Sequence, residues 1–192
     1  MGRMASARVL AALVVVALLG ACTDEPPGDE PPGEPSVALR VTTVKGAGAL
    51  DETDRTELES AVGEVLSRYV VGAFLGDYPR DDFVRSFDDF TSGTAQYAAA
   101  DIDVLTAARV ADATDVRATR LDARLSFLVD NRDVIGATAA VQFEFEATMP
   151  DGDTQDMSLG GRLMLQEGPD GWAVFGYDVA SDDGAAQSGE LS

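Results

Sequence analysis

The sequence predicts an α+β domain with its helices in the first half and its strands in the second. Apolar residues recur at three- and four-residue spacing across residues 56–75, which is typical of an amphipathic helix. Apolar and polar residues alternate in three segments between 121 and 165, and a fourth segment, 172–179, is apolar on both faces. Because 45% of the residues are hydrophobic and 25% are charged, the composition is that of a globular protein.

Residues 1–21 combine a basic start with a short apolar run. Arg3 and Arg8 precede Val9–Leu19, which is too short to span a bilayer as a mature helix but fits the apolar core of a signal peptide. The run ends in Leu19-Gly20-Ala21-Cys22, which resembles the lipobox of bacterial lipoproteins. This resemblance implies cleavage before Cys22 and attachment of a diacylglyceryl group, with acyl chains such as palmitate, to its sulfur. An ordinary secretory signal peptide is the alternative.

Residues 22–36 are predicted to be a tether. The sequence Asp-Glu-Pro-Pro-Gly occurs at 24–28 and again at 29–33, and the whole stretch contains five prolines, five acids and no base. Such a segment cannot bury apolar area and favours the extended polyproline II conformation. At about 3.1 Å per residue, residues 24–36 would span about 40 Å. A spacer is favoured over a docking ligand for another protein.

The helical half of the domain follows an extended lead-in. Residues 37–50 are expected to form that lead-in, with alternation at its start that is typical of a short strand. Thr56-Glu57-Leu58-Glu59 matches a capping box and predicts the start of the long helix, and Gly76 and Pro79 predict its end. A second helical region is predicted in pieces over 80–106.

The second half is predicted to be a four-stranded antiparallel meander. Alternation predicts strands at 121–129, 139–147 and 157–165, and the apolar segment 172–179 is the fourth. Short turns rich in Asp, Gly and Pro separate them, as expected for antiparallel neighbours. Residues 181–192 are small and polar and are expected to be a disordered tail.

This order of elements resembles a known fold family. A long helix, shorter helices and a meander that closes on Gly171-Trp172-Ala173-Val174-Phe175-Gly176-Tyr177 resemble the NTF2-like (cystatin-like) α+β cone, and the segment 101–106 adds to the resemblance. It covers residues 51–180 and is most similar to the form found in small envelope lipoproteins and Mce-associated proteins of actinobacteria. The resemblance implies helices packed on a curved four-stranded sheet, and it makes a homodimer possible.

Composition excludes several classes of function. The formal net charge of -20 repels phosphate backbones and excludes nucleic acid as a partner. The chain has no histidine and a single cysteine, which removes histidine-dependent nucleophiles, histidine zinc sites and CxxC chemistry. We therefore expect no cofactor and no metal. Asp151, Asp153 and Asp156 offer oxygen ligands for calcium, but their spacing is not that of an EF-hand and a polar hairpin turn is favoured.

Acids and aromatic residues supply the remaining site candidates. A carboxylate at Asp101 or Asp103 that faced the cone would act as a base, and the alternative is that both are solvated or cap a helix. Aromatic side chains would line an apolar pocket if the cone is hollow, and would otherwise fill the core. These six candidates are Tyr69, Phe74, Phe143, Phe145, Phe175 and Tyr177.

Three functions follow, in order of preference. The first is a non-catalytic lipoprotein, anchored at the extracytoplasmic face of the cell membrane, that binds another envelope component as an accessory module. The second is a carrier or sensor of a small apolar ligand held in the cone. The third is an isomerase or dehydratase that works without histidine, using a carboxylate and a tyrosine.

Overall fold

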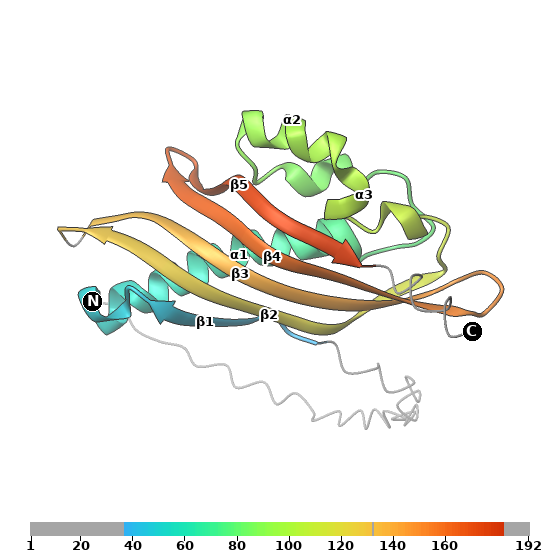
Figure 1. The fold of residues 1–192 in the computed structure, drawn as a ribbon, viewed down its shortest axis with the longest axis horizontal. Coiled ribbons are helices and arrows are strands. Elements are labelled where there is room, and N and C mark those ends of the chain that lie inside the picture. The colour runs from blue at the N-terminus through green and yellow to red at the C-terminus, as the bar shows by residue number, and fades with distance from the viewer. Residues whose placement is uncertain (1–36, 132, 183–192) are drawn as a thin grey trace, which may run out of the picture. The chain divides into compact units, whose positions relative to one another are not determined.

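The computed structural model describes residues 37–131 and 133–182 (Figure 1). The predicted signal peptide, Cys22, the tether and most of the predicted tail lie outside these residues. The strands are β1 (Arg40–Lys45), β2 (Asp115–Asp130), β3 (Asp133–Thr148), β4 (Thr154–Gly168) and β5 (Gly171–Asp182). The helices are α1 (Glu52–Phe74), α2 (Ser92–Ala100) and α3 (Ile102–Leu105), with short 3-10 turns η1 (Ala47–Ala49), η2 (Val84–Phe87) and η3 (Ala108–Val110).

The strands form one mixed sheet in the order β1-β2-β3-β4-β5 (Figure 1). The four long strands pair antiparallel in chain order, whereas β1 pairs parallel with β2. The α+β class is confirmed, but the prediction of a four-stranded antiparallel meander is wrong. Parallel neighbours need a long crossover connection, and here the connection includes α1. The local alternation at 37–41 indicates an extended segment but carries no information about a partner more than seventy residues away.

Helix α1 begins earlier than the capping box predicts. Asp51 is the N-cap, and its carboxylate accepts a hydrogen bond from the backbone N–H of Asp54 at 2.9 Å. An N-cap aspartate satisfies one of the free N–H groups of the first turn, so the helix extends back to Glu52. The Thr56 hydroxyl then donates to the Glu52 carbonyl inside the helix. The helix ends at Phe74, just before Gly76 with φ of 112°, close to the predicted end.

The core lies between the helices and one face of the sheet. The buried side chains of α1 are Val62, Val65, Leu66, Tyr69, Val70, Ala73 and Phe74. They meet the inward-facing residues of the strands, and the rings of Phe74 and Phe145 stack with centroids 4.3 Å apart and an interplanar angle of 9°. Burying a large apolar side chain stabilises the fold by about 1.5–3 kcal/mol. The predicted apolar face of this helix is therefore confirmed.

The loop before α2 covers the first part of the outer edge of β5. The Thr91 N–H donates to the Val174 carbonyl at 2.8 Å, and the Val174 N–H donates to the Asp89 carbonyl at 2.9 Å. The Thr94 hydroxyl adds a bond to the Phe175 carbonyl at 2.8 Å. These contacts fix Asp89 beside the start of β5, and α2 and α3 lie along the same strand (Figure 1). None of the helices in the described ranges has both the length and the hydropathy that a bilayer span requires.

Candidate functional site

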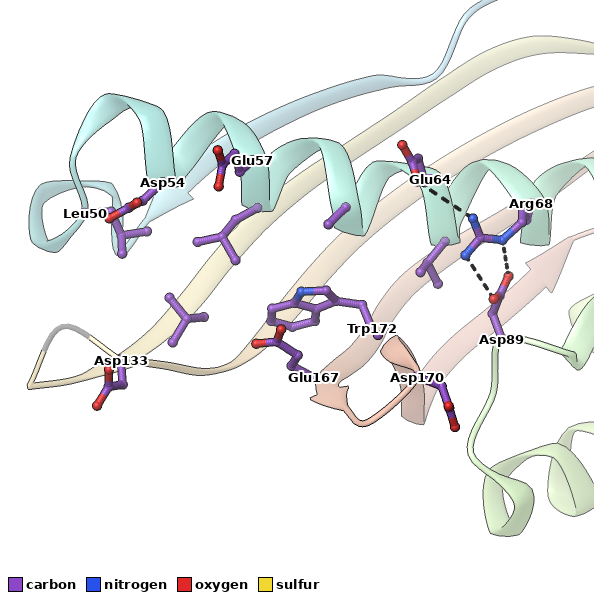
Figure 2. A pocket seen from close by; sticks show the side chains of 15 residues that line it. Leu50, Asp54, Glu57, Glu64, Arg68, Asp89, Asp133, Glu167, Asp170 and Trp172 are labelled. Carbon is purple, nitrogen blue, oxygen red and sulfur yellow. Dashed lines mark hydrogen bonds and ion pairs between the residues drawn. The ribbon is translucent and has the colours of Figure 1, made fainter.

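A cleft of about 730 Å³ opens between α1, from Asp54 to Arg68, the start of β3 and the hairpin that joins β4 to β5 (Figure 2). Apolar side chains form its floor and carboxylates surround them. The apolar residues are Leu50, Leu58, Ala61, Val65, Val134 and Trp172. The charged residues are Asp54, Glu57, Glu64, Arg68, Asp89, Asp133, Glu167 and Asp170.

Helix α1 contributes one complete face to the cleft. Residues three and four positions apart lie on the same side of a helix, so Asp54, Glu57, Ala61, Glu64 and Arg68 form a row along it. Figure 2 shows this row above the strand ends. The buried apolar residues of α1 lie beside this row. The row therefore lies at the edge of the core, where the helix meets solvent.

The sheet contributes the facing wall. Glu167 at the end of β4 and Trp172 at the start of β5 are paired in register, and they lie side by side in the cleft (Figure 2). The Trp172 side chain is only 9% exposed. Its indole N–H is a hydrogen-bond donor and has no hydrogen-bond partner among the described residues. A nearly buried ring thus presents an unused donor at this wall.

Arg68 and Asp89 form an ion pair with close geometry in the cleft. The Nε and one terminal nitrogen of Arg68 donate to the two carboxylate oxygens of Asp89, at 2.7 and 3.0 Å. Glu64 lies 4.0 Å from the same guanidinium group. The hydrogen bond to Asp89 raises the pKa of Arg68 above its ordinary value. Such a two-point pair fixes both side chains, so this cation is already engaged with protein carboxylates.

The remaining carboxylates of the cleft have no such partner. Within residues 37–131 and 133–182, no hydrogen bond or ion pair engages the side chains of the following five acids. They are Asp54, Glu57, Asp133, Glu167 and Asp170. Nor do three or more acids in this part of the chain lie close enough together to hold a metal ion. The negative charge is therefore spread around an apolar floor.

Four of the six predicted pocket-lining aromatics lie in the packed core. Tyr69, Phe74, Phe143 and Phe145 are each at most 3% exposed. The Tyr69 hydroxyl donates to the Leu105 carbonyl at 2.6 Å, and burial raises the pKa of this tyrosine well above its usual value. Tyr69 also packs its ring against those of Phe74 and Phe90. This arrangement favours the alternative in which these residues fill the interior.

The other two predicted aromatics lie on β5, outside the cleft. Phe175 is 45% exposed, whereas Tyr177 is half-buried and donates from its hydroxyl to the Asp101 carboxylate at 2.7 Å. Desolvation raises the pKa of Tyr177 to about 12, and the hydrogen bond and charge of Asp101 contribute to the shift. This contact ties β5 to the start of α3. Asp101 is itself exposed and is not among the residues that line the cleft.

The predicted hairpin turn after β3 is present. The Asp151 carboxylate accepts a hydrogen bond from the Asp153 N–H at 3.1 Å, and the Asp153 carbonyl accepts one from the Met149 N–H at 2.8 Å. These are turn contacts, as the preferred interpretation of this acidic segment expects. No metal-holding group of three acids occurs here or elsewhere among the residues that the structure describes.

Sequence reasoning missed the cleft. Its acids come from the long helix, the loop before α2, the start of β3 and the hairpin between β4 and β5, and only the fold brings them together. Two signals could have pointed to it. Asp54, Glu57 and Glu64 share one helix face, and the only tryptophan in the chain directly follows a turn. Both features also occur in ordinary surface helices and strands, so neither identifies a site without the fold.

Comparison with family models, with curated proteins and with solved structures gives no match to this chain.

Proposed function

We propose that this chain is a non-catalytic lipoprotein of the bacterial cell envelope, anchored through Cys22 at the extracytoplasmic face of the cell membrane. The lipobox-like sequence that ends at Cys22 and the acidic, proline-rich residues 22–36 support this proposal. Two acyl chains are enough to hold a water-soluble domain stably on a bilayer. The membrane is then its first partner, and the tether holds the domain away from it.

We also propose that the domain is NTF2-like. Helix α1, the shorter helices after it and the antiparallel strands β2 to β5 follow the order that this fold requires. Strand β1 adds a parallel neighbour at one edge of that arrangement. The fold alone does not indicate a chemistry, because one fold supports many unrelated functions.

The proposed role of the domain is to bind a ligand or an envelope partner in the cleft. The observation that carries this role is a partly apolar cleft whose Trp172 N–H and five carboxylates have no partner among the described residues. The five carboxylates are exposed, and the Trp172 N–H is not among the buried unpaired atoms, so these groups face solvent and can contact a bound molecule. The volume lies in the range of small-molecule sites, about 300–1,000 Å³.

The two alternative functions have less support. A carrier with an apolar ligand inside the cone would need interior space where the aromatic side chains of Tyr69, Phe74 and Phe145 now pack. An enzyme that uses a carboxylate and a tyrosine would have Asp101 and Tyr177 as its nearest candidate pair. That pair lies outside the cleft and ties α3 to β5, which is a structural role.

Co-purification tests the binding role. The full chain is recovered from membranes in a non-ionic detergent, and proteins and small molecules that accompany it are identified by mass spectrometry. Ala61→Phe is expected to fill the cleft floor and to remove the specific component. Thr53→Phe lies on an exposed side of the same helix and is expected to retain it. The same set of components in both variants would argue against the cleft as the binding site.

A further inference from the structure

The negative charge of the cleft determines which charge its ligand can carry. Among the described residues, seven carboxylates line it, and the one guanidinium, Arg68, is already bound at two points by Asp89. An anionic ligand would find no free cation among these residues and would be repelled by every unpaired acid. The cleft is therefore unsuited to phosphates and carboxylates and suited to a positive charge.

The apolar floor of the cleft indicates that the ligand also has an apolar part. Leu58, Ala61, Val65 and Val134 present aliphatic surface between the charged groups. A strongly hydrated inorganic cation would gain nothing from this surface, and no group of three acids among the described residues lies close enough together to coordinate one. A cation with an apolar body would bury that body on the floor while its charge faces the acids.

Trp172 supplies a second and independent feature that points to a ligand. Its ring is nine-tenths buried at the cleft wall, and its N–H has no partner in the described part of the chain. Tryptophan is the strongest of the aromatic side chains in attracting a cation to the face of its ring. Glu167 lies next to the ring in register and adds a negative charge at the same point (Figure 2).

We infer that the cleft binds a small organic cation, an ammonium or guanidinium group carried on an apolar body, through Trp172 and the carboxylates of Glu57 and Glu167. The inference rests on the proposed use of the cleft as a binding site and names the chemical class of its ligand. The nearby indole N–H further favours a ligand that carries a hydrogen-bond acceptor beside its charge.

The fluorescence of Trp172 tests the inference directly, because it is the only tryptophan in the chain. The full chain in non-ionic detergent is titrated with three molecules that share one apolar ring and do not fluoresce. They are (cyclohexylmethyl)trimethylammonium, uncharged cyclohexylmethanol and anionic cyclohexylacetate. We expect saturable binding of the cation, at least tenfold weaker binding of the alcohol and no binding of the anion. The affinity for the cation is expected to fall as sodium chloride is added, because salt screens exposed charges.

Charge-neutral variants locate the interaction. Glu57→Gln and Glu167→Gln are each expected to weaken cation binding by about two- to fivefold, the range of single exposed charge pairs. Trp172→Phe, followed by calorimetry, is expected to weaken it by about threefold or more, since phenylalanine attracts a cation less strongly. Asp112→Asn removes an exposed acid outside the cleft and is expected to leave the affinity unchanged.

The three molecules distinguish a failure of the inferred ligand class from a failure of the proposed binding role of the cleft. If the alcohol binds as tightly as the cation, the inferred ligand class is wrong while the cleft remains a binding site. If none of the three changes the fluorescence or releases heat, the cation inference fails together with the proposed use of this cleft for small molecules. Equal loss of cation affinity in Asp112→Asn and Glu167→Gln would contradict the assignment of residues.

Discussion

The hydroxyl of Tyr69 offers the sharpest test of how the interior is held together. This side chain is 0% exposed, and its hydroxyl joins the C-terminal part of α1 to the last residue of α3 through a 2.6 Å bond to the Leu105 carbonyl. Tyr69→Phe keeps the ring, and with it the contacts to Phe74 and Phe90. Only the hydrogen bond is lost, and a buried carbonyl loses a donor.

The expected cost is a fall of about 1–3 kcal/mol in the free energy of unfolding, the range for a buried polar group that loses its partner. With an m-value of about 2 kcal/mol per M in urea, the midpoint falls by about 0.5–1.5 M. Urea titrations followed by far-UV circular dichroism measure this change. Tyr97→Phe is the matched control, because Tyr97 is 74% exposed and its change is expected to be within about 0.5 kcal/mol. Equal midpoints for the two variants would refute the role assigned to this hydrogen bond.

The remaining predictions concern the sheet, alkaline pH and the anchor. Gly161 has φ of 141°, and an added Cβ would collide with the backbone of β5. Gly161→Ala is therefore expected to lower the free energy of unfolding by about 2 kcal/mol or more, measured by thermal or urea unfolding. Gly160→Ala is the control, because nothing lies within 4 Å of an added Cβ there, and equal losses in the two variants would contradict this geometry. The pKa values of Tyr78 and Tyr177 are raised to about 12, chiefly by desolvation. The stability that these neutral hydroxyls contribute is therefore fully present below about pH 10, the pKa of tyrosine in the unfolded chain. It is lost as the pH rises from there through about 12. Urea midpoints at pH 9 and pH 11.5 measure this loss, which is expected to be smaller in Tyr177→Phe; an identical loss would count against the shift. Cys22→Ala is expected to move the protein from the membrane fraction to the soluble fraction, and unchanged partitioning on fractionated cells would contradict the lipid anchor.

The elements that could be predicted are those fixed by local pattern. Alternation identified β2 to β4 because each of these long strands buries one face, and β5 was identified from a short apolar segment after a turn. The helical spacing in 56–75 identified the buried stripe of α1. The start of that helix was misjudged because two capping sequences lie five residues apart, and Asp51 caps the helix in place of Thr56.

The features that could not be predicted depend on distant contacts. The parallel pairing of β1 with β2 joins segments that are separated by three helices, and nothing in either segment specifies the other. The cleft likewise needs the α1 face, Asp89 and two hairpin turns to come together. The aromatic residues were identified as apolar, but whether Tyr69 or Phe143 faces a cavity or a neighbour depends on packing, and burial places both in the core.

Ligands are expected to bind in the cleft beside Trp172 while the aromatic interior stays closed. Two-dimensional ¹H–¹⁵N spectra recorded while (cyclohexylmethyl)trimethylammonium is added test it most directly. We expect the indole N–H signal of Trp172 and the amides near Glu57 and Glu167 to shift in a saturable way, with the amides of Tyr69 and Phe143 unchanged. Shifts centred on Tyr69 and Phe143, with the Trp172 signal unmoved, would contradict the account.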